Sequence, residues 1–108
     1  MNIAHRDIKL DNILLAKDRN GEIQVKLIDF GCATYYFEGE PMGQGCGSIF
    51  YMAPEVFFNY YTEKCDVWSI GIITFACLFG RFPFDDHDMS KIEEKVLSKK
   101  LSLSREEK

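Results

Sequence analysis

The chain has 108 residues, a formal net charge of −4 and a hydrophobic content of 46%. This length suits one domain at most, and the apolar content is too high for a wholly disordered chain. The acidic balance argues against a general nucleic-acid-binding protein.

The N-terminal part predicts a two-stranded antiparallel hairpin. The apolar run 12–16 is typical of a short strand, and residues 22–30 alternate in part between apolar and polar. Asn20 and Gly21 indicate the turn between them, because both residue types tolerate positive φ. We therefore expect Asp29 to lie at the exit of this hairpin.

The middle of the chain predicts a long loop followed by helices. Residues 31–53 are rich in glycine, and a loop of this length in a compact domain is either functional or disordered. Pro54 suits the first turn of a short helix. Thr62 is the expected cap of a buried helix over about 63–79, and Gly80 is expected to end it.

The C-terminal part predicts one amphipathic helix over about 90–100. Ser90 is its expected cap, and Ile92 and Val96 fall on one apolar stripe. The charged end, residues 104–108, is expected to be a loose tail.

Four cysteines, Cys32, Cys46, Cys65 and Cys77, form no CxxC pair and have no histidine at zinc-ligand spacing. We expect four reduced thiols in an intracellular, cytoplasmic protein, because disulfides are rare in the cytosol. The N-terminus has no secretory signal pattern. The apolar run 67–80 is shorter than the roughly 18 residues that suggest a membrane span, so no span is expected.

Three motifs occur in a fixed order along the chain: HRDIKLDN at 5–12, DFG at 29–31 and APE at 53–55. With ~5% usage per residue, five fixed positions of the first motif arise by chance about once in three million starts. These motifs resemble the catalytic loop and activation segment of eukaryotic protein kinases. The resemblance runs over residues 5–100 and is closest to serine/threonine kinases, with GSIFYMAPEVF most like the calcium/calmodulin-dependent group.

The resemblance implies an α+β fold that is a fragment of the mainly helical C-terminal lobe of a protein kinase. A β-hairpin would bear the catalytic loop (5–12) and the DFG motif. A long activation loop would follow within the activation segment (29–55). A buried central helix (about 63–79) and a short amphipathic helix (about 90–100) would complete it.

The resemblance also assigns roles to four polar residues. Asp7 is the expected catalytic base, and Lys9 is expected to contact ATP and steady the migrating γ-phosphoryl group. Asn12 and Asp29 are the expected ligands of Mg²⁺, a hard ion that prefers oxygen. ATP and Mg²⁺ are therefore the implied cofactors, and the antiparallel hairpin would bring both ligands to one end.

Other positions fit supporting roles in this family. Ser48 stands where a threonine commonly lines the substrate pocket and bonds the catalytic aspartate. Asp66 is expected to accept hydrogen bonds from the catalytic-loop backbone, and Glu55 to pair with an arginine further along a kinase chain. Lys9 indicates serine/threonine specificity. Asp11 indicates a substrate with an arginine or lysine near the phosphorylated residue. An ordinary solvated aspartate in a loop would explain Asp11 equally well.

Arg6 would normally pair with a phosphate on the activation segment. The usual acceptor position falls near Gln44, which cannot be phosphorylated. Glu38 or Glu40 could substitute for the phosphate, Thr34 could be modified, or Arg6 could lack a loop partner. The sequence leaves these alternatives open.

The expected function is that of a serine/threonine protein kinase fragment, transferring phosphate from ATP to hydroxyls of protein substrates. Only four residues precede His5, so the N-lobe's glycine-rich loop and lysine are missing, and the isolated chain is expected to be inactive. The stretch GQGCGS at 43–48 does not match GxGxxG, the pattern of a nucleotide-binding glycine loop, because Ser48 stands at the last position. No predicted strand leads into it either. The alternative is a non-catalytic, kinase-derived binding or regulatory fragment, with exposed apolar helix surface. Lys9 and the APE motif disfavour a small-molecule phosphotransferase, and the sequence indicates no oligomeric state.

Overall fold

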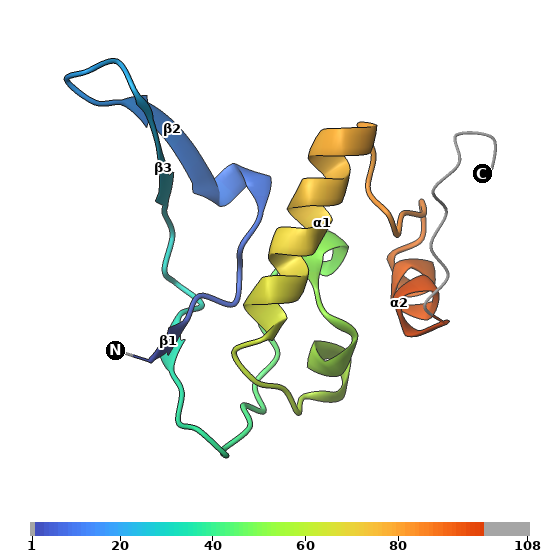
Figure 1. The fold of residues 1–108 in the computed structure, drawn as a ribbon. Coiled ribbons are helices and arrows are strands. Elements are labelled where there is room, and N and C mark those ends of the chain that lie inside the picture. Colours follow the sequence, from blue (N-terminus) through green and yellow to red (C-terminus); the bar gives the residue numbers. More distant parts are fainter. Residues whose placement is uncertain (1, 99–108) are drawn as a thin grey trace.

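The structure is a computed structural model, and it describes residues 2–98. Two small antiparallel sheets, short 3₁₀ helices and two α-helices give the chain an α+β composition. In Figure 1 the helix α1 (Cys65–Phe79) lies in the centre, with a β-hairpin on one side and the helix α2 (Met89–Ser98) on the other.

The predicted hairpin is confirmed. Strand β2 (Ile13–Lys17) pairs with β3 (Ile23–Leu27) in an antiparallel register in which Ile13 opposes Leu27 and Lys17 opposes Ile23. The hairpin projects away from α1 (Figure 1). Leu15 is 69% exposed, and within residues 2–98 the other large apolar side chains of both strands are exposed too, except Ile13, which is partly buried.

The turn of the hairpin is longer than the predicted Asn20-Gly21 pair. It spans residues 18–22, and Gly21 has a φ of +79° while Asn20 keeps a negative φ. The side chain of Asp18 organises it: Oδ1 accepts the backbone N–H groups of Asn20 at 2.8 Å and Glu22 at 2.9 Å. An aspartate that bonds its own following backbone replaces the two-residue turn.

A second sheet was not predicted. Strand β1 (Ile3–Ala4) pairs with β4 (Thr34–Tyr35), with Ala4 opposite Thr34. Strand β4 lies inside the stretch 31–53, for which a loop is expected from the sequence. A strand of two residues is too short to show an alternating pattern. Each of these strands therefore forms because the other lies beside it and pairs with it.

Helix α1 begins later than expected, at Cys65. Thr62 caps the turn before the helix: its carbonyl accepts the Cys65 N–H at 3.1 Å, and its Oγ1 accepts the Lys64 N–H at 3.3 Å. At the other end Gly80 adopts a φ of +70° and donates its N–H to the carbonyl of Ala76. Glycine adopts this left-handed conformation without steric cost, which explains the helix end.

Within residues 2–98 the central helix is buried along one side and exposed along the other, which fits the expected exposed apolar helix surface. Cys65, Ser69 and Ile72 are buried on one side of α1, whereas Val67 is 66% and Leu78 is 73% exposed. The apolar outer side of α1 has no described neighbour that covers it. None of the helices within residues 2–98 is long and apolar enough to cross a membrane.

The cap of α2 is Asp88 rather than the expected Ser90. Asp88 Oδ1 accepts both the backbone N–H of Ser90 at 3.0 Å and its hydroxyl at 2.8 Å. Ile92 and Val96 are buried, as the predicted stripe requires. The expected last two helical residues, 99–100, and the expected tail, 104–108, lie outside the described residues.

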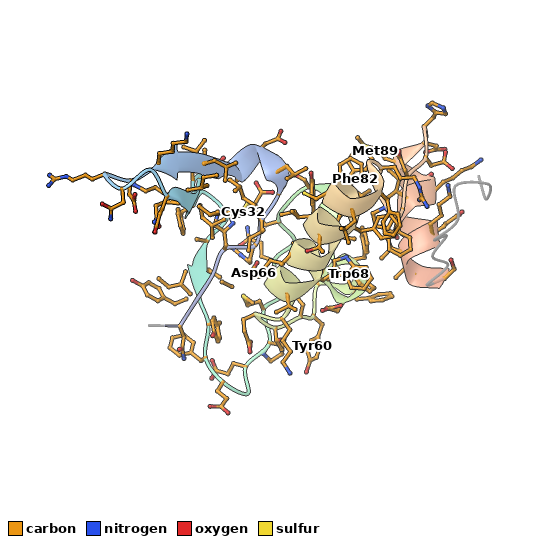
Figure 2. All side chains as sticks on the ribbon, turned by 45° about the horizontal axis from the view of Figure 1, so that its top comes forward. Cys32, Tyr60, Asp66, Trp68, Phe82 and Met89 are labelled. Carbon is orange, nitrogen blue, oxygen red and sulfur yellow. A yellow bond between two sulfur atoms is a disulfide. The ribbon has the colours of Figure 1, made fainter. Side chains whose placement is uncertain are left out.

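The main hydrophobic core joins α1, α2 and the 3₁₀ helix η2 (Ile49–Tyr51). Its buried members are Tyr51, Ile72, Phe84, Ile92 and Val96. Figure 2 shows Phe82 and Trp68 on this side of α1. A second cluster joins α1 to the 3₁₀ helix η3 (Pro54–Phe58), which Pro54 begins as predicted. These two clusters hold residues 48–55 against α1, beside the predicted catalytic loop.

Candidate active site

The backbone of the loop 5–8 is held by the first turn of α1. The Asp66 carboxylate accepts the backbone N–H of His5 at 2.8 Å through Oδ2 and that of Arg6 at 2.9 Å through Oδ1. An aspartate in a first helical turn is also favoured by the helix dipole. Arg6 has a φ of +69°, a conformation that costs a non-glycine residue about 1–3 kcal/mol. The charge-assisted bonds to Asp66 help to hold it there.

His5 braces this loop from inside. Its Nε2 donates to the carbonyl of Ile28 at 3.0 Å, and its Nδ1 accepts the backbone N–H of Asp7 at 3.1 Å. These two contacts require the neutral tautomer with the proton on Nε2. The ring of Phe30 meets the imidazole edge-on, with 4.8 Å between centroids. The histidine therefore joins the first two sequence motifs in space.

A hydrogen-bonded chain links the predicted base, cation and substrate-pocket residue. The Ser48 hydroxyl donates to Asp7 Oδ1 at 3.1 Å and accepts from Lys9 Nζ at 2.9 Å. The amide nitrogen of Asn12 donates to the Asp7 carbonyl at 2.9 Å and lies 3.4 Å from Asp7 Oδ2. Asn12 is buried at the end of the short helix η1 (Leu10–Asn12). These four residues thus form one site.

Asp29 lies beside this site, but its side chain is turned to its own loop. The backbone N–H of Ile28 donates to the Asn12 carbonyl at 2.9 Å, which extends the hairpin register to the residue before Asp29. Asp29 has a φ of +58°, and its Oδ1 accepts the N–H of Gly31 at 3.2 Å. Within residues 2–98, no three side chains of His, Cys, Asp or Glu cluster so as to hold a metal ion.

The expectation of four reduced thiols is wrong. Cys32 and Cys46 form a disulfide, with 6.1 Å between their Cα atoms, while Cys65 is buried and reduced and Cys77 is exposed and reduced. The two bonded cysteines are 14 residues apart in the sequence. Since only the return of the activation segment to the catalytic loop brings them together, their spacing gave no signal of pairing.

The side chain of Arg6 binds carbonyl groups of the activation segment. Its Nε donates to the Cys32 carbonyl at 2.6 Å, and its Nη1 donates to the Tyr61 hydroxyl at 3.1 Å and lies 3.4 Å from the Gln44 carbonyl. The Tyr61 hydroxyl donates to the same Gln44 carbonyl. Arg6 therefore has loop partners, and within residues 2–98 neither Glu38 nor Glu40 is among them.

Gly47 is a position of close backbone approach in the candidate site that was not predicted from the sequence. It has a φ of +112°, and a Cβ built there would lie 2.5 Å from the carbonyl oxygen of Arg6. The backbone can approach the catalytic loop this closely only without a side chain. The following residue, Ser48, thereby reaches Asp7. The signal available in the sequence was a glycine directly before the substrate-pocket residue.

Two further expected positions, Glu55 and Asp11, form no hydrogen bond or ion pair with the other site residues within residues 2–98. Glu55 lies in the first turn of η3, and its carboxylate forms no hydrogen bond or ion pair within residues 2–98. Asp11 is exposed at the surface of η1. The structure thus brings Arg6, Asp7, Lys9, Asn12, Ser48 and Asp66 into contact, with Asp29 adjacent.

The sequence family described as protein kinase domain matches residues 1–108. The chain belongs to the protein kinase family. It is 39% identical over 105 residues to a probable serine/threonine-protein kinase KIN1 homolog of Enterocytozoon bieneusi, covering 95% of this chain and 17% of that protein. It is 40% identical over 103 residues to the serine/threonine-protein kinase ppk25 of Schizosaccharomyces pombe, covering 94% and 24%.

A third kinase relative is calcium-dependent protein kinase 4 of Plasmodium berghei, 39% identical over 95 residues, or 88% of this chain and 18% of that protein. These relatives place the chain among serine/threonine kinases and agree with the resemblance seen in the motifs. The kinase chain spans less than a quarter of the length of each of these relatives.

Proposed function

We propose that the protein transfers the γ-phosphoryl group of ATP, with Mg²⁺, to serine or threonine hydroxyls of protein substrates. The names of its relatives support the serine/threonine class. The observation that carries the proposal is the Ser48 hydroxyl, which bridges the carboxylate of Asp7 and the ammonium of Lys9. Held in this way, the carboxylate can accept the proton of the attacking hydroxyl, and the cation can neutralise charge on the phosphoryl group being transferred.

In this proposal Asp7 is the base that receives the substrate proton. Ser48 bonds its Oδ1 at 3.1 Å, while the Asn12 amide contacts Oδ2 only at 3.4 Å, so we assign the more loosely held Oδ2 to the incoming hydroxyl. The proton moves to Asp7 as the substrate oxygen forms a bond to the γ-phosphorus, while the bond from that phosphorus to the β-phosphate oxygen breaks and ADP leaves. Lys9 places its positive charge beside the oxygens of the group in transit.

Asn12 and Asp29 are the residues that would hold Mg²⁺. Because the Asn12 amide nitrogen donates to Asp7, its amide oxygen is the atom left to face a cation. Asp29 would offer a carboxylate after turning away from the N–H of Gly31. When bound, the ion supplies neutralisation of the phosphate charge. The donor set of an amide and a carboxylate oxygen fits a hard divalent cation.

We further propose that the described residues form part of a kinase C-terminal lobe, and that a polypeptide of residues 1–108 alone transfers phosphate slowly. No glycine-rich loop following a strand occurs in its sequence. The stretch 43–48 lies instead in the activation segment and contains the disulfide-bonded Cys46. The exposed carboxylate of Asp11 supports a substrate with a basic residue near its hydroxyl.

A phosphate-transfer assay with radiolabelled ATP, Mg²⁺ and serine-containing basic peptides tests the proposal. The protein is expressed from its complete coding sequence, and Asp7→Asn is compared with Glu93→Gln, an exposed carboxylate of α2. We expect Asp7→Asn to lower the rate by about 10²–10⁴-fold, the usual contribution of a general base. Transfer that survives this change would overturn the assignment of Asp7.

A second candidate function is a non-catalytic binding or regulatory role. It is favoured by the exposed apolar side chains of the hairpin and of the outer side of α1. If the protein transfers no phosphate under any condition but co-elutes with a kinase or its substrate in size-exclusion chromatography, this second function replaces the first.

A further inference from the structure

The Cys32–Cys46 disulfide closes the activation segment into a ring beside the catalytic loop. Cys32 directly follows the DFG motif, and Cys46 stands two residues before Ser48. Cys32 lies between the hairpin and α1 in Figure 2. One bond thus joins the beginning of the segment to the part that reaches Asp7.

Arg6 binds the same two ends that the disulfide joins. Its guanidinium donates to the carbonyl of Cys32 and lies within hydrogen-bond distance of the carbonyl of Gln44. Both carbonyl groups face Arg6 only while the two stretches lie side by side. The disulfide therefore stabilises the arrangement that Arg6 recognises, because it removes conformations in which the ends separate.

The position of Ser48 depends on this arrangement. Gly47 lies directly against the Arg6 carbonyl, and the next residue places its hydroxyl between Lys9 and Asp7. A separation of Cys46 from Cys32 would free the backbone that leads into this contact. The disulfide and the contact of Ser48 with Asp7 therefore lie on one continuous stretch of backbone.

The two sulfurs are also open to exchange. Cys32 and Cys46 are both partly exposed, and the glycines on either side of Cys46 are exposed. Small thiols can therefore reach the bond, whereas Cys65 is buried. Cys77 is exposed on α1 and has no disulfide partner.

We propose that the Cys32–Cys46 disulfide is a reversible redox switch that holds Ser48 against Asp7 and Lys9 when oxidised and releases it when reduced. The structural part of the switch stands by itself, and its effect on phosphate transfer rests on the proposed kinase function. The reaction is thiol–disulfide exchange with glutathione. One cysteine thiolate attacks glutathione disulfide and expels one glutathione, and the second cysteine attacks the mixed disulfide and expels another. Two cysteine thiols and one glutathione disulfide thus give one protein disulfide and two glutathione thiols.

The test equilibrates the protein, expressed from its complete coding sequence, in buffers of varied glutathione redox ratio. Mass spectrometry after alkylation gives the oxidised fraction. Hydrogen exchange is followed at the amide of Met42, which lies inside the ring and donates to the Tyr61 carbonyl. The amide of Gly80, bonded to Ala76 at the end of α1, serves as the control for global unfolding.

On reduction we expect exchange at Met42 to become at least about tenfold faster, given the stabilisation typical of a ring of this size. Exchange at Gly80 should stay unchanged, and reoxidation should restore Met42. Cys32→Ser and Cys46→Ser should each exchange at the reduced rate in every buffer, while Cys77→Ser should respond as the wild type does. Phosphate transfer should fall on reduction by up to the same factor and return on reoxidation.

The outcomes separate the two proposals. A disulfide that does not form at any glutathione ratio, or exchange at Met42 that ignores its redox state, overturns the switch. Phosphate transfer that is present but equal in both states also overturns it. If no phosphate transfer occurs in either state, the kinase function fails, while a redox-dependent exchange rate at Met42 still supports the structural switch.

Discussion

Asp66 Oδ1 accepts the backbone N–H of Arg6 at 2.9 Å, across 60 residues of sequence. The other oxygen of the same carboxylate accepts the N–H of His5. Arg6 sits at a positive φ, and its neighbour in the chain is the proposed base, Asp7. The first turn of α1 therefore sets the backbone geometry from which the Asp7 side chain projects.

Replacing Asp66 should destabilise the protein and its catalytic loop together. Asp66→Ala removes both acceptors, and hydrogen bonds to a charged group contribute about 1.5–3 kcal/mol each. Asp66→Asn should be milder, because its amide oxygen still accepts one of the two N–H groups. Urea denaturation measures the loss in the free energy of unfolding, with Glu93→Gln as the control. Equal stability of Asp66→Ala and wild type would show that this contact does not hold the loop.

Gly47→Ala should separate the activation segment from the catalytic loop. The new Cβ would lie 2.5 Å from the Arg6 carbonyl oxygen, so the backbone must shift. Gly39→Ala is a matched control, since Gly39 also has a positive φ, +83°, but nothing lies within 4 Å of its Cβ position. The control should cost about 1 kcal/mol from backbone strain alone. We expect Gly47→Ala to cost more and to slow phosphate transfer, and equal effects of both changes would refute the close approach.

Ser48→Ala and Ser48→Thr should behave differently in the phosphate-transfer assay. Alanine removes the hydroxyl that bridges Lys9 and Asp7. Loss of a hydrogen bond to a charged group should slow transfer by about 10- to 100-fold. Threonine keeps the hydroxyl and should retain most of the rate. Ser98→Ala, at the exposed end of α2, is the control, and an active Ser48→Ala enzyme would contradict the proposed bridge.

The features that sequence predicted well are those with a local cause. The hairpin follows from two apolar runs separated by a turn. The start of η3 follows from the fixed φ of Pro54, and the end of α1 follows from the positive φ that Gly80 can adopt. The candidate site residues come from ordered motifs, since each motif places several chemical groups at fixed spacing, and their catalytic roles stay predictions. Local signals of this kind do not depend on the rest of the fold.

The features that sequence missed depend on contacts between distant segments. The β1–β4 sheet, the Cys32–Cys46 disulfide and the carbonyl partners of Arg6 all require the activation segment to return to the catalytic loop. No periodicity marks them. An exposed apolar surface on α1 was expected, but which side of the helix is buried depends on its packing against η2 and η3.

The hairpin turn should weaken in acid. Hydrogen bonds from the backbone of Glu22 first, and of Asn20, lower the pKa of Asp18 from its ordinary value of 3.8. A group whose pKa is lowered by folding stabilises the fold above its unfolded pKa, and that stabilisation is lost as the pH falls through the lowered value. We expect cross-strand contacts between β2 and β3, followed by NMR, to weaken as the pH falls below 3.8. Asp18→Ala should show this weakening at neutral pH, whereas Arg19→Ala should not.

Cys65 should be nearly inert to alkylation in the folded protein. Burial in the core first, and the negative charges of Asp66 and Glu55, raise the pKa of its thiol from 9.0 to about 12. At pH 8 its thiolate fraction should be about a thousandfold lower than in the unfolded chain, because each unit of pKa is a factor of ten. Iodoacetamide labelling followed by mass spectrometry should therefore modify Cys77 first. Denatured protein should label both alike, and rapid labelling of folded Cys65 would contradict its burial.

The same shift makes the fold sensitive to alkali. A group whose pKa is raised by folding gives its full stabilisation below the unfolded pKa, here 9.0, and loses it as the pH rises toward about 12. Above pH 9 the unfolded chain ionises at Cys65 while the folded chain does not, so the melting temperature should fall. Cys65→Ala removes this titration and should flatten the decline, although it lowers the stability at neutral pH by opening a small cavity. If both proteins decline with the same slope, then other groups cause the sensitivity to alkali.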